Sequence, residues 1–285
     1  MSNLPLDQSS EVSYDKPVDH AEMSFLDHLE ELRWHIIRAF AAILVFSIAA
    51  FVAKSLVFGG VILGPARTDF WTYQMLCRLS ELLNSAALCI DDLNFTLQSR
   101  KMVGQFTMHI TYSFAVGTTI AFPYAFWEIW RFVSPGLYVN ERQVARGAVF
   151  YVSLLFMIGI LFGYFVLTPL SVQFLAGYQL DPSIKNDFDI VSYVSTVTTL
   201  VLGCGILFQL PMVVLFLTKS GLLTPDLMIQ YRKHGIVAIF FLGALLTPPD
   251  PFSQVLVAIP LIGLYQLSIW VSRRAYNKRK RELAG

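Results

Sequence analysis

The sequence predicts an all-α integral membrane protein with six membrane-spanning helices, and three observations carry that prediction. Of the 285 residues, 55% are hydrophobic and only 14% are charged, whereas soluble domains carry about 25% charged residues. The mean hydropathy is +0.57. The apolar residues are gathered in runs that approach the length of about 20 residues needed to cross a bilayer as a helix. The net charge of +1 gives no reason to expect a nucleic-acid partner.

The chain divides into a polar start, a membrane domain and a basic end. Residues 1–22 are polar and mostly acidic, without the basic start and apolar core of a secretory signal, so we expect a cytoplasmic tail followed by a retained first span. The membrane domain is expected at 23–270, and 271–285 is a basic cytoplasmic tail suited to anionic lipid. Hydropathy windows of about 19 residues place the spans at roughly 35–57, 106–130, 147–168, 193–218, 235–246 and 252–270.

The charge distribution predicts the orientation. An even number of spans puts both termini on one side. The segments on that side, the tail above all, hold most of the Lys and Arg residues outside the spans. Since cytoplasmic loops carry the excess of basic residues, both termini are expected to be cytoplasmic.

The fifth and sixth spans are predicted to be short. The fifth is stopped at "TPPDP" (Thr247 to Pro251), because proline cannot continue a helix and restricts the residue before it. Two short spans either thin the lipid locally or leave a cavity open on one side, which predicts a concave face. A re-entrant hairpin buried by its neighbours is the alternative.

The segment between the first two spans, about 58–105, is long enough for structure of its own. "RLSELLNSAALC" (Arg78 to Cys89) has apolar residues at helical spacing, which predicts one or two short surface helices. Cys77 and Cys89 lie on the side expected to be oxidising, so they form a disulfide or remain free thiols.

The sequence lacks motifs for enzyme chemistry. It contains no G-x-x-x-x-G-K-[ST] phosphate cradle, no C-x-x-C and no H-E-x-x-H. His28, Glu31 and His35 can share one helix face, but no other segment supplies the further ligand that a metal site needs. We therefore expect no metal, no cofactor and no enzymatic activity.

The stretch "MSFLDHLEELRWHIIRAF" (Met23 to Phe40) places charge at the start of the first span. Ser24 and Asp27 fit a capping box, so a helix is expected to begin there. Glu30, Glu31 and Arg33 then occupy its first turns. Acidic residues are favoured near any helix N-terminus, so ordinary helix-start electrostatics would explain this stretch if it stood alone.

Three separated motifs carry a resemblance to a known family. "HLEELRWHI" (His28 to Ile36) resembles the H-L-x-E-L-R-x-R-[LI] signature of TatC, the receptor subunit of the twin-arginine translocase. "RFVSPGLYVNER" (Arg131 to Arg142) resembles the family's F-x-x-P-x-L-[YF]-x-x-E-[RK] cytoplasmic loop, and "LTPPDPFSQ" (Leu246 to Gln254) resembles its L-T-P-P-D-x-x-[ST]-Q turn. The three occur in the family's order on a matching six-span plan.

The resemblance implies a receptor that binds the consecutive arginines of signal peptides on folded proteins. A guanidinium is a planar fork that pairs bidentately with a carboxylate, so two arginines call for two carboxylates. By motif position these are Glu31 and Glu141, and Arg33 is expected to orient Glu31 or the loop. The remaining signal-peptide residues implied by the loop motif are Phe132, Pro135, Leu137, Tyr138 and Arg142.

Two glutamines at membrane depth form a second group of candidates. Gln209 stands where the family commonly has a glutamate, which keeps hydrogen bonding but loses the charge, and Gln254 matches the motif glutamine. Both are expected to dock a partner helix or, alternatively, to bond internally between spans. Structural turns are implied at Pro65, Pro248, Pro249 and Asp250, with Asp250 capping the sixth span rather than acting in catalysis.

The resemblance also implies the setting: a bacterial inner membrane, small single-span partners resembling TatA and TatB, self-association in a multi-copy complex, and export driven by the proton gradient. A small-molecule transporter is the rival class, but the sequence shows no inverted repeat. A structural scaffold is the third class. The sequence leaves copy number, substrate repertoire and translocation path open.

Overall fold

A computed structural model describes residues 25–83, 89, 93, 95–133, 139–181, 183–184, 186–247 and 251–284. At 25–29, 139–146 and 278–284 the backbone alone is described. In chain order the elements are α1 (Phe25–Val52), η1 (Ser55–Ile62), η2 (Gly64–Ala66), α2 (Trp71–Leu83), β1 (Phe95–Gln98), α3 (Gly104–Val133), α4 (Val139–Phe162), η5 (Gly163–Leu167), α5 (Thr168–Gly177), β2 (Asn186–Asp189), α6 (Ile190–Leu207), α7 (Leu210–Lys219), α8 (Pro225–Gln230), α9 (Arg232–Leu246) and α10 (Pro251–Ala284).

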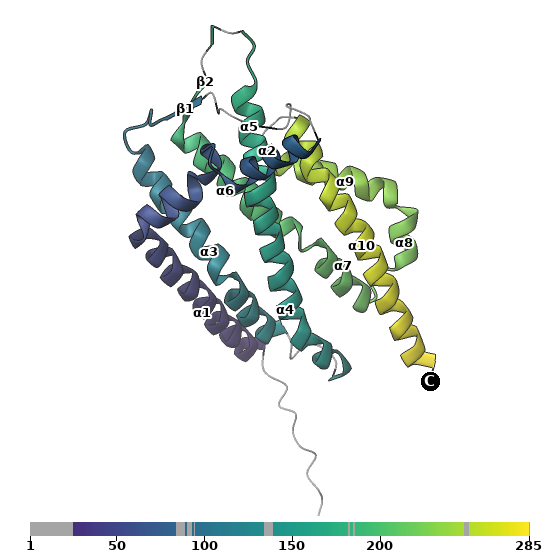
Figure 1. Cartoon of the computed structure of the whole chain (residues 1–285). Helices are drawn as coiled ribbons and strands as arrows, with labels where there is room; N and C mark the ends of the chain where they lie inside the picture. Colours follow the sequence, from purple (N-terminus) through teal and green to yellow (C-terminus); the bar gives the residue numbers. More distant parts are fainter. Residues whose placement is uncertain are drawn as a thin grey trace, which may run out of the picture.

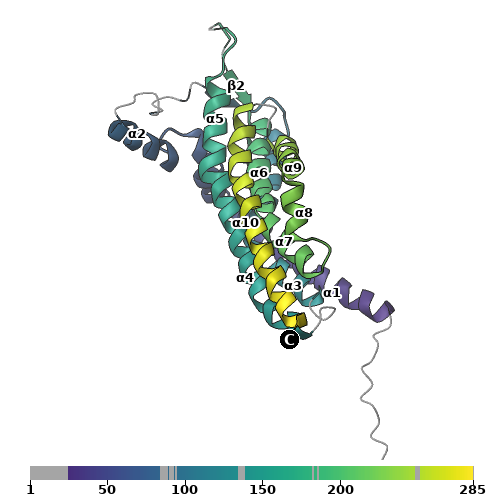
Figure 2. The ribbon, with the colours of Figure 1, turned by 90° about the vertical axis from the view of Figure 1, so that its right-hand side faces the viewer.

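The long helices lie beside one another and define two ends of the bundle. Figure 1 shows α1 beginning and α10 finishing at the bottom of the view, which we call the lower end. The two strands and α2 lie at the opposite, upper end. In Figure 2, turned by 90°, α2 projects away from the bundle. The lower end therefore gathers the first turns of α1, the last turns of α3, the first turns of α4 and the last turns of α10.

Among the described residues, four helical segments are long and apolar enough to cross a membrane, and they make this a multi-pass membrane protein. They are Glu30–Val52, Gly147–Gly177, Ile190–Lys219 and Pro251–Asn277. These correspond to the predicted first, third, fourth and sixth spans, while α3 and α9 are not among them. Large apolar side chains stay exposed along these segments, for example Val45, Val52 and Ile259, as expected of helices whose outer solvent is hydrocarbon.

Helices α1 and α3 pack against each other antiparallel along most of their length. Gly117 on α3 meets Ser47 on α1, where a Cβ added to the glycine would lie 2.6 Å from the Ser47 Cα. No side chain larger than hydrogen fits there, so the two backbones approach closely, as small residues allow in membrane helices. This close approach fixes the register between α1 and α3.

The predicted third and fourth spans are each built from more than one helical piece. In the third, α4 passes through η5 into α5, which has Pro169 in its first turn. In the fourth, α6 ends before Phe208 and Gln209, and α7 begins with Pro211 in its first turn. Proline is tolerated at these positions because the first turn of a helix needs no internal N–H donor.

The fifth helix is short, but the sixth is not. Helix α9 has 15 residues, which span about 22 Å at 1.5 Å per residue. Helix α10 has 34 residues and continues into the basic tail, so the prediction of a short sixth span is wrong. The apolar run gives way to basic residues from Arg273 onward, but Lys and Arg favour helix, so α10 continues beyond it.

The upper end holds the segment between the first two spans. Helix α2 is one of the surface helices that the sequence predicts, and Cys77 and Cys89 are joined by a disulfide. The Tyr73 side chain of α2 is fully buried and its hydroxyl donates to the Pro65 and Pro169 carbonyls. Strands β1 and β2, which the sequence did not predict, pair in parallel from Phe95 onward. These contacts tie the segment to the bundle.

Candidate functional site

A buried carboxylate is the centre of the lower end. Glu128, near the end of α3, is 1% exposed. Its Oε2 lies 2.6 Å from Nδ1 of His35 on α1, and the Tyr124 hydroxyl donates to its Oε1 at 3.0 Å. The guanidinium groups of Arg38 and Arg131 each come within 4.0 Å of a Glu128 oxygen. A buried charge is tolerated only when it is paired and hydrogen-bonded, and this one has four partners.

Helix periodicity brings these partners together. His35 and Arg38 are three apart on α1, and Tyr124 and Arg131 stand four before and three after Glu128 on α3. Residues three and four apart share one face of a helix, so each helix presents its polar face to the other. Arg131 also lies over the Trp127 ring, 4.9 Å from its centroid. The cluster therefore joins α1 to α3 at the lower end, well below the Gly117 contact.

His35 links this cluster to Glu31. Its Nδ1 faces Glu128, and its Nε2 lies 4.0 Å from Oε1 of Glu31, one turn earlier on α1. An imidazole ring has a nitrogen on each side, so His35 lies between the two carboxylates. The Glu31 side chain is 42% exposed. Glu31 is therefore a surface carboxylate beside His35, and His35 is held in place by its buried hydrogen bond to Glu128.

Other predicted residues of the first and second motifs lie around this point. Arg33 is exposed, and two residues along a helix do not face each other, so it does not orient Glu31 through the helix face. The Phe132 ring, on the last turn of α3, is 6.3 Å from the His35 ring, centroid to centroid. Phe132 thus covers one side of the His35 ring.

The rest of the loop motif is only partly described. Glu141 and Arg142 belong to the first turn of α4 rather than to a loop, and their side chains are outside the described set. Pro135, Leu137 and Tyr138 lie outside the described residues, as do Pro248, Pro249 and Asp250 of the third motif. Pro65 of the predicted turns lies in η2, the helical element that precedes α2 along the chain.

Sequence reasoning missed Glu128, His35's role with it, and Arg38. The signal was present, because Glu128 lies inside the predicted second span at 106–130, and an ionisable residue inside a span marks a functional or paired site. The flanking Tyr124 and Arg131, at helical spacing, were a second signal. A hydropathy average hides one carboxylate among apolar neighbours.

The two glutamines make internal contacts. Gln209, between α6 and α7, donates through Nε2 to the Val152 and Gly205 carbonyls at 3.2 and 3.3 Å. Its Oε1 is buried and has no hydrogen-bond partner among the described residues. Gln254, in the first turns of α10, donates to the Phe240 carbonyl of α9 at 3.4 Å. Each glutamine thus links two spans, and Gln209 retains one unused acceptor.

Metal chemistry finds no support among the described residues. Within that part of the chain, no three His, Cys, Asp or Glu side chains are placed to hold a metal ion. The cluster around Glu128 consists of one carboxylate with cationic and hydroxyl donors, which suits charge pairing and helix joining rather than bond-making chemistry.

The chain is similar to known proteins over most of its length. The family model described as TatC, Sec-independent protein translocase protein, matches residues 27–260. The TatC of Blattabacterium sp. subsp. Periplaneta americana (strain BPLAN) is 36% identical over 260 residues, covering 90% of this chain and 98% of the relative. The TatCy of Bacillus subtilis (strain 168) is 30% identical over 263 residues, covering 92% of this chain and 94% of the relative.

Solved structures agree in fold. A crystal structure of the twin-arginine translocase receptor TatC superposes with a TM-score of 0.64 at 32% identity, covering 87% of this chain and 99% of the other. A second one, described as being in DDM, gives a TM-score of 0.68 at 32% identity, covering 86% and 99%.

Proposed function

Because this chain belongs to the TatC family of Sec-independent protein translocase proteins, we propose that it binds the twin-arginine signal peptides of folded proteins at the lower end of the bundle. It is a translocase receptor subunit and not an enzyme. The observation that carries the proposal is the half-exposed Glu31 carboxylate, whose neighbour His35 is fixed by the buried Glu128. A fixed carboxylate at the rim is what a guanidinium fork needs for a bidentate pair.

Two carboxylates serve two arginines in this proposal. Glu31 takes one guanidinium, and Glu141, in the first turn of α4, takes the other. Exposed ion pairs are worth only about 0–1 kcal/mol each, so charge alone gives little selectivity. Preference for arginine over lysine then depends on orientation, because a guanidinium donates two parallel hydrogen bonds and an ammonium does not. Phe132, Pro135, Leu137 and Tyr138 shape the site in this proposal, and Arg33 and Arg142 contribute from the same two helices as the carboxylates.

The proposed setting is a bacterial inner membrane with both termini cytoplasmic. In this topology α3 and α9 join the four long apolar segments to give six spans. Two observations support it: α1 begins and α10 finishes at the same end of the bundle, and the disulfide Cys77–Cys89 lies at the opposite end. Disulfides persist on the oxidising side of a membrane, so the upper end is assigned to the outside.

Partner docking is proposed at the later spans. The Oε1 of Gln209 is buried and has no hydrogen-bond partner among the described residues; once the side chain turns outward, it accepts a hydrogen bond from a polar residue on a single-span subunit that resembles TatA or TatB. Gln254 is the second proposed docking residue, and several copies of this chain are proposed to assemble with these subunits for transport driven by the proton gradient. Interhelical hydrogen bonds of this kind are worth about 0.6 kcal/mol on average in lipid, so docking also needs apolar packing.

The test is photocrosslinking in native membranes. A photoreactive residue replaces Leu137, and the membranes receive a signal peptide with either Arg-Arg or Lys-Lys at its motif. Glu31→Gln and Glu141→Gln are the test variants. Glu30→Gln is the matched control, because Glu30 is also exposed on α1 and loses the same charge.

The receptor proposal expects a strong adduct with Arg-Arg that is lost with Lys-Lys and in both test variants, and kept in the control. Equal adducts with Arg-Arg and Lys-Lys would favour a scaffold without an arginine site. Equal loss in Glu31→Gln and Glu30→Gln would mean that net charge at the start of α1, not the position of Glu31, attracts the peptide.

A further inference from the structure

A cavity at the upper end has the composition of a lipid headgroup site. It has a volume of about 450 Å³, is partly open, and lies where η1, the end of β1, the first turns of α3 and the start of α6 meet. Its lining residues are Lys54, Phe58, Leu63, Leu97, Gln98, Ser99, Gln105, Phe106, His109, Tyr112 and Ile190. The volume falls within the range of small-molecule sites, about 300–1,000 Å³.

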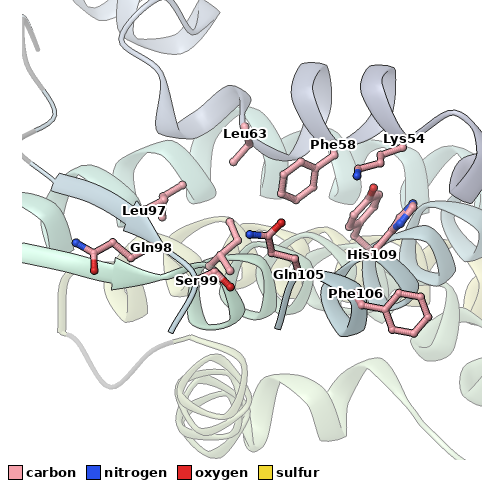
Figure 3. Close-up of a pocket in the computed structure, with 11 residues that line it drawn as sticks. Lys54, Phe58, Leu63, Leu97, Gln98, Ser99, Gln105, Phe106 and His109 are labelled. Carbon is pink, nitrogen blue, oxygen red and sulfur yellow. The ribbon is translucent and has the colours of Figure 1, made fainter. Parts of the chain in front are cut away.

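The charges in this cavity favour an anion. Lys54 is the N-cap residue of η1 and forms no ion pair among the described residues. His109 is the other lining residue that can carry positive charge, and no carboxylate is among the lining residues. Figure 3 shows the Lys54 ammonium and the Gln105 amide pointing into the space between η1 and α3. A lone cation with amide donors around it is a phosphate-binding arrangement.

A buried hydroxyl without a partner is the second, independent observation. Tyr112 is 1% exposed, lines the cavity, and its hydroxyl has no hydrogen-bond partner among the described residues. A buried polar group left unpaired costs about 1–3 kcal/mol, so such groups call for a ligand or water. The Tyr112 ring is held between Phe58 and His109, 5.2 and 5.3 Å away centroid to centroid. The hydroxyl is therefore a fixed donor at the cavity wall.

The cavity opens beside an exposed apolar surface. Phe106, which lines it, is 62% exposed, and Ile110, one turn further along α3, is 50% exposed. Phe51 and Val52, at the end of α1, are exposed next to Lys54. An occupant with a polar head in the cavity and apolar chains along α1 and α3 matches both surfaces. A soluble anion would leave the apolar side unused.

We propose that this cavity binds the headgroup of an anionic phospholipid, with Lys54 pairing its phosphate and Tyr112 donating to it. The occupant is anionic rather than zwitterionic because the lining is cationic and offers no carboxylate to an ammonium group. The proposal goes beyond the receptor function and does not rest on the signal-peptide site. With the proposed topology, the lipid belongs to the outer leaflet.

The test is native mass spectrometry of the full chain in detergent micelles with phosphatidylglycerol or phosphatidylethanolamine added. Lys54→Met and Tyr112→Phe are the test variants. Arg78→Met is the matched control, because Arg78 is an exposed basic residue of the same end, on α2, outside the cavity. Thermal unfolding of each variant checks that it is folded, and Tyr112→Phe removes no internal hydrogen bond among the described residues.

We expect phosphatidylglycerol to bind at least about tenfold more tightly than phosphatidylethanolamine, which is about 1.4 kcal/mol. Lys54→Met should weaken the binding of phosphatidylglycerol by about tenfold, and Tyr112→Phe should weaken it by about threefold. Arg78→Met should leave this binding unchanged. Equal weakening in Lys54→Met and Arg78→Met would overturn the proposal, since general surface charge would then explain binding. Displacement of the lipid by glycerol phosphate at equal concentration would overturn it in favour of a soluble anion.

Discussion

The His35–Glu128 pair should contribute more to folding than its position at the lower end of the bundle suggests. Both side chains are nearly fully buried, and the closest atoms are 2.6 Å apart. Removing one partner of a buried ion pair costs about 3–5 kcal/mol, because the other charge is left without compensation. Arg38 and Arg131 remain near Glu128, but both are about half exposed and 4.0 Å away. We therefore place His35→Ala at the lower limit, a loss of about 3 kcal/mol.

A double-mutant cycle isolates this pair. His35→Ala, Glu128→Ala and the double variant are unfolded reversibly in mixed micelles by adding SDS, and tryptophan fluorescence follows the transition. Trp127 and Trp130 flank Glu128 and report on this end of α3. The cavity left by each alanine appears in both halves of the cycle and cancels in the coupling energy. A charge-assisted hydrogen bond predicts a coupling energy of about 2 kcal/mol.

The control cycle uses an ion pair with similar chemistry but no burial. Arg67 Nε lies 3.2 Å from Asp69 Oδ1, and both side chains are mostly exposed. Exposed pairs contribute about 0–1 kcal/mol, so Arg67→Ala and Asp69→Ala should give additive losses. If the coupling energy of His35 and Glu128 is no larger than that of Arg67 and Asp69, then burial does not strengthen this pair and our reading of the site is wrong.

Two further predictions concern helix packing and a loop carboxylate. Gly117→Ala should destabilise the protein by about 1–3 kcal/mol through the clash with Ser47. Gly263→Ala, which has open space around its α position, should instead stabilise α10 by up to about 1 kcal/mol. Equal midpoints of SDS unfolding for the two variants would contradict this. The Ser183 hydroxyl and N–H donate to Asp181 and lower the pKa of its carboxyl. The stability that these bonds give is therefore present above the unfolded-state pKa of Asp181. It is lost as the pH falls through the folded-state pKa of that carboxyl. An NMR titration should show the Asp181 pKa rising towards its ordinary value in Ser183→Ala, and an unchanged pKa would rule out the hydroxyl as the main cause.

Local signals in the sequence predicted much of the helical plan. The first helix, which the sequence predicts to begin near Ser24, is described as α1 from Phe25 onward. The fifth helix ends at Leu246, directly before the "TPPDP" stop. These features could be predicted because hydropathy and proline act within a few residues. The α1–α3 pairing could not, since it depends on Gly117 meeting a residue that is distant in sequence.

Other features depend on tertiary contacts and were missed. The third span contains η5, and the fourth is broken between α6 and α7. Neither feature interrupts the apolar run in the sequence, so a hydropathy window predicts one continuous helix for each span. Strands β1 and β2 are four residues each and pair across a long separation in sequence. Isolated short strands are marginal in water, so pairing on top of the bundle, rather than local propensity, explains them.

The same helix pair connects the two sites at opposite ends of the bundle. From His35 to Ser47 along α1 is about 18 Å, and from Glu128 back to Gly117 along α3 is about 17 Å, at 1.5 Å per residue. The two helices therefore keep register from the buried ion pair to the close contact. Beyond that contact, His109 of α3 stacks on Phe51 of α1 with a centroid distance of 3.8 Å, next to Lys54. Because the register is fixed at Gly117, a shift of α1 against α3 would have to move both the Glu31 carboxylate at one end and the wall of the Lys54 cavity at the other.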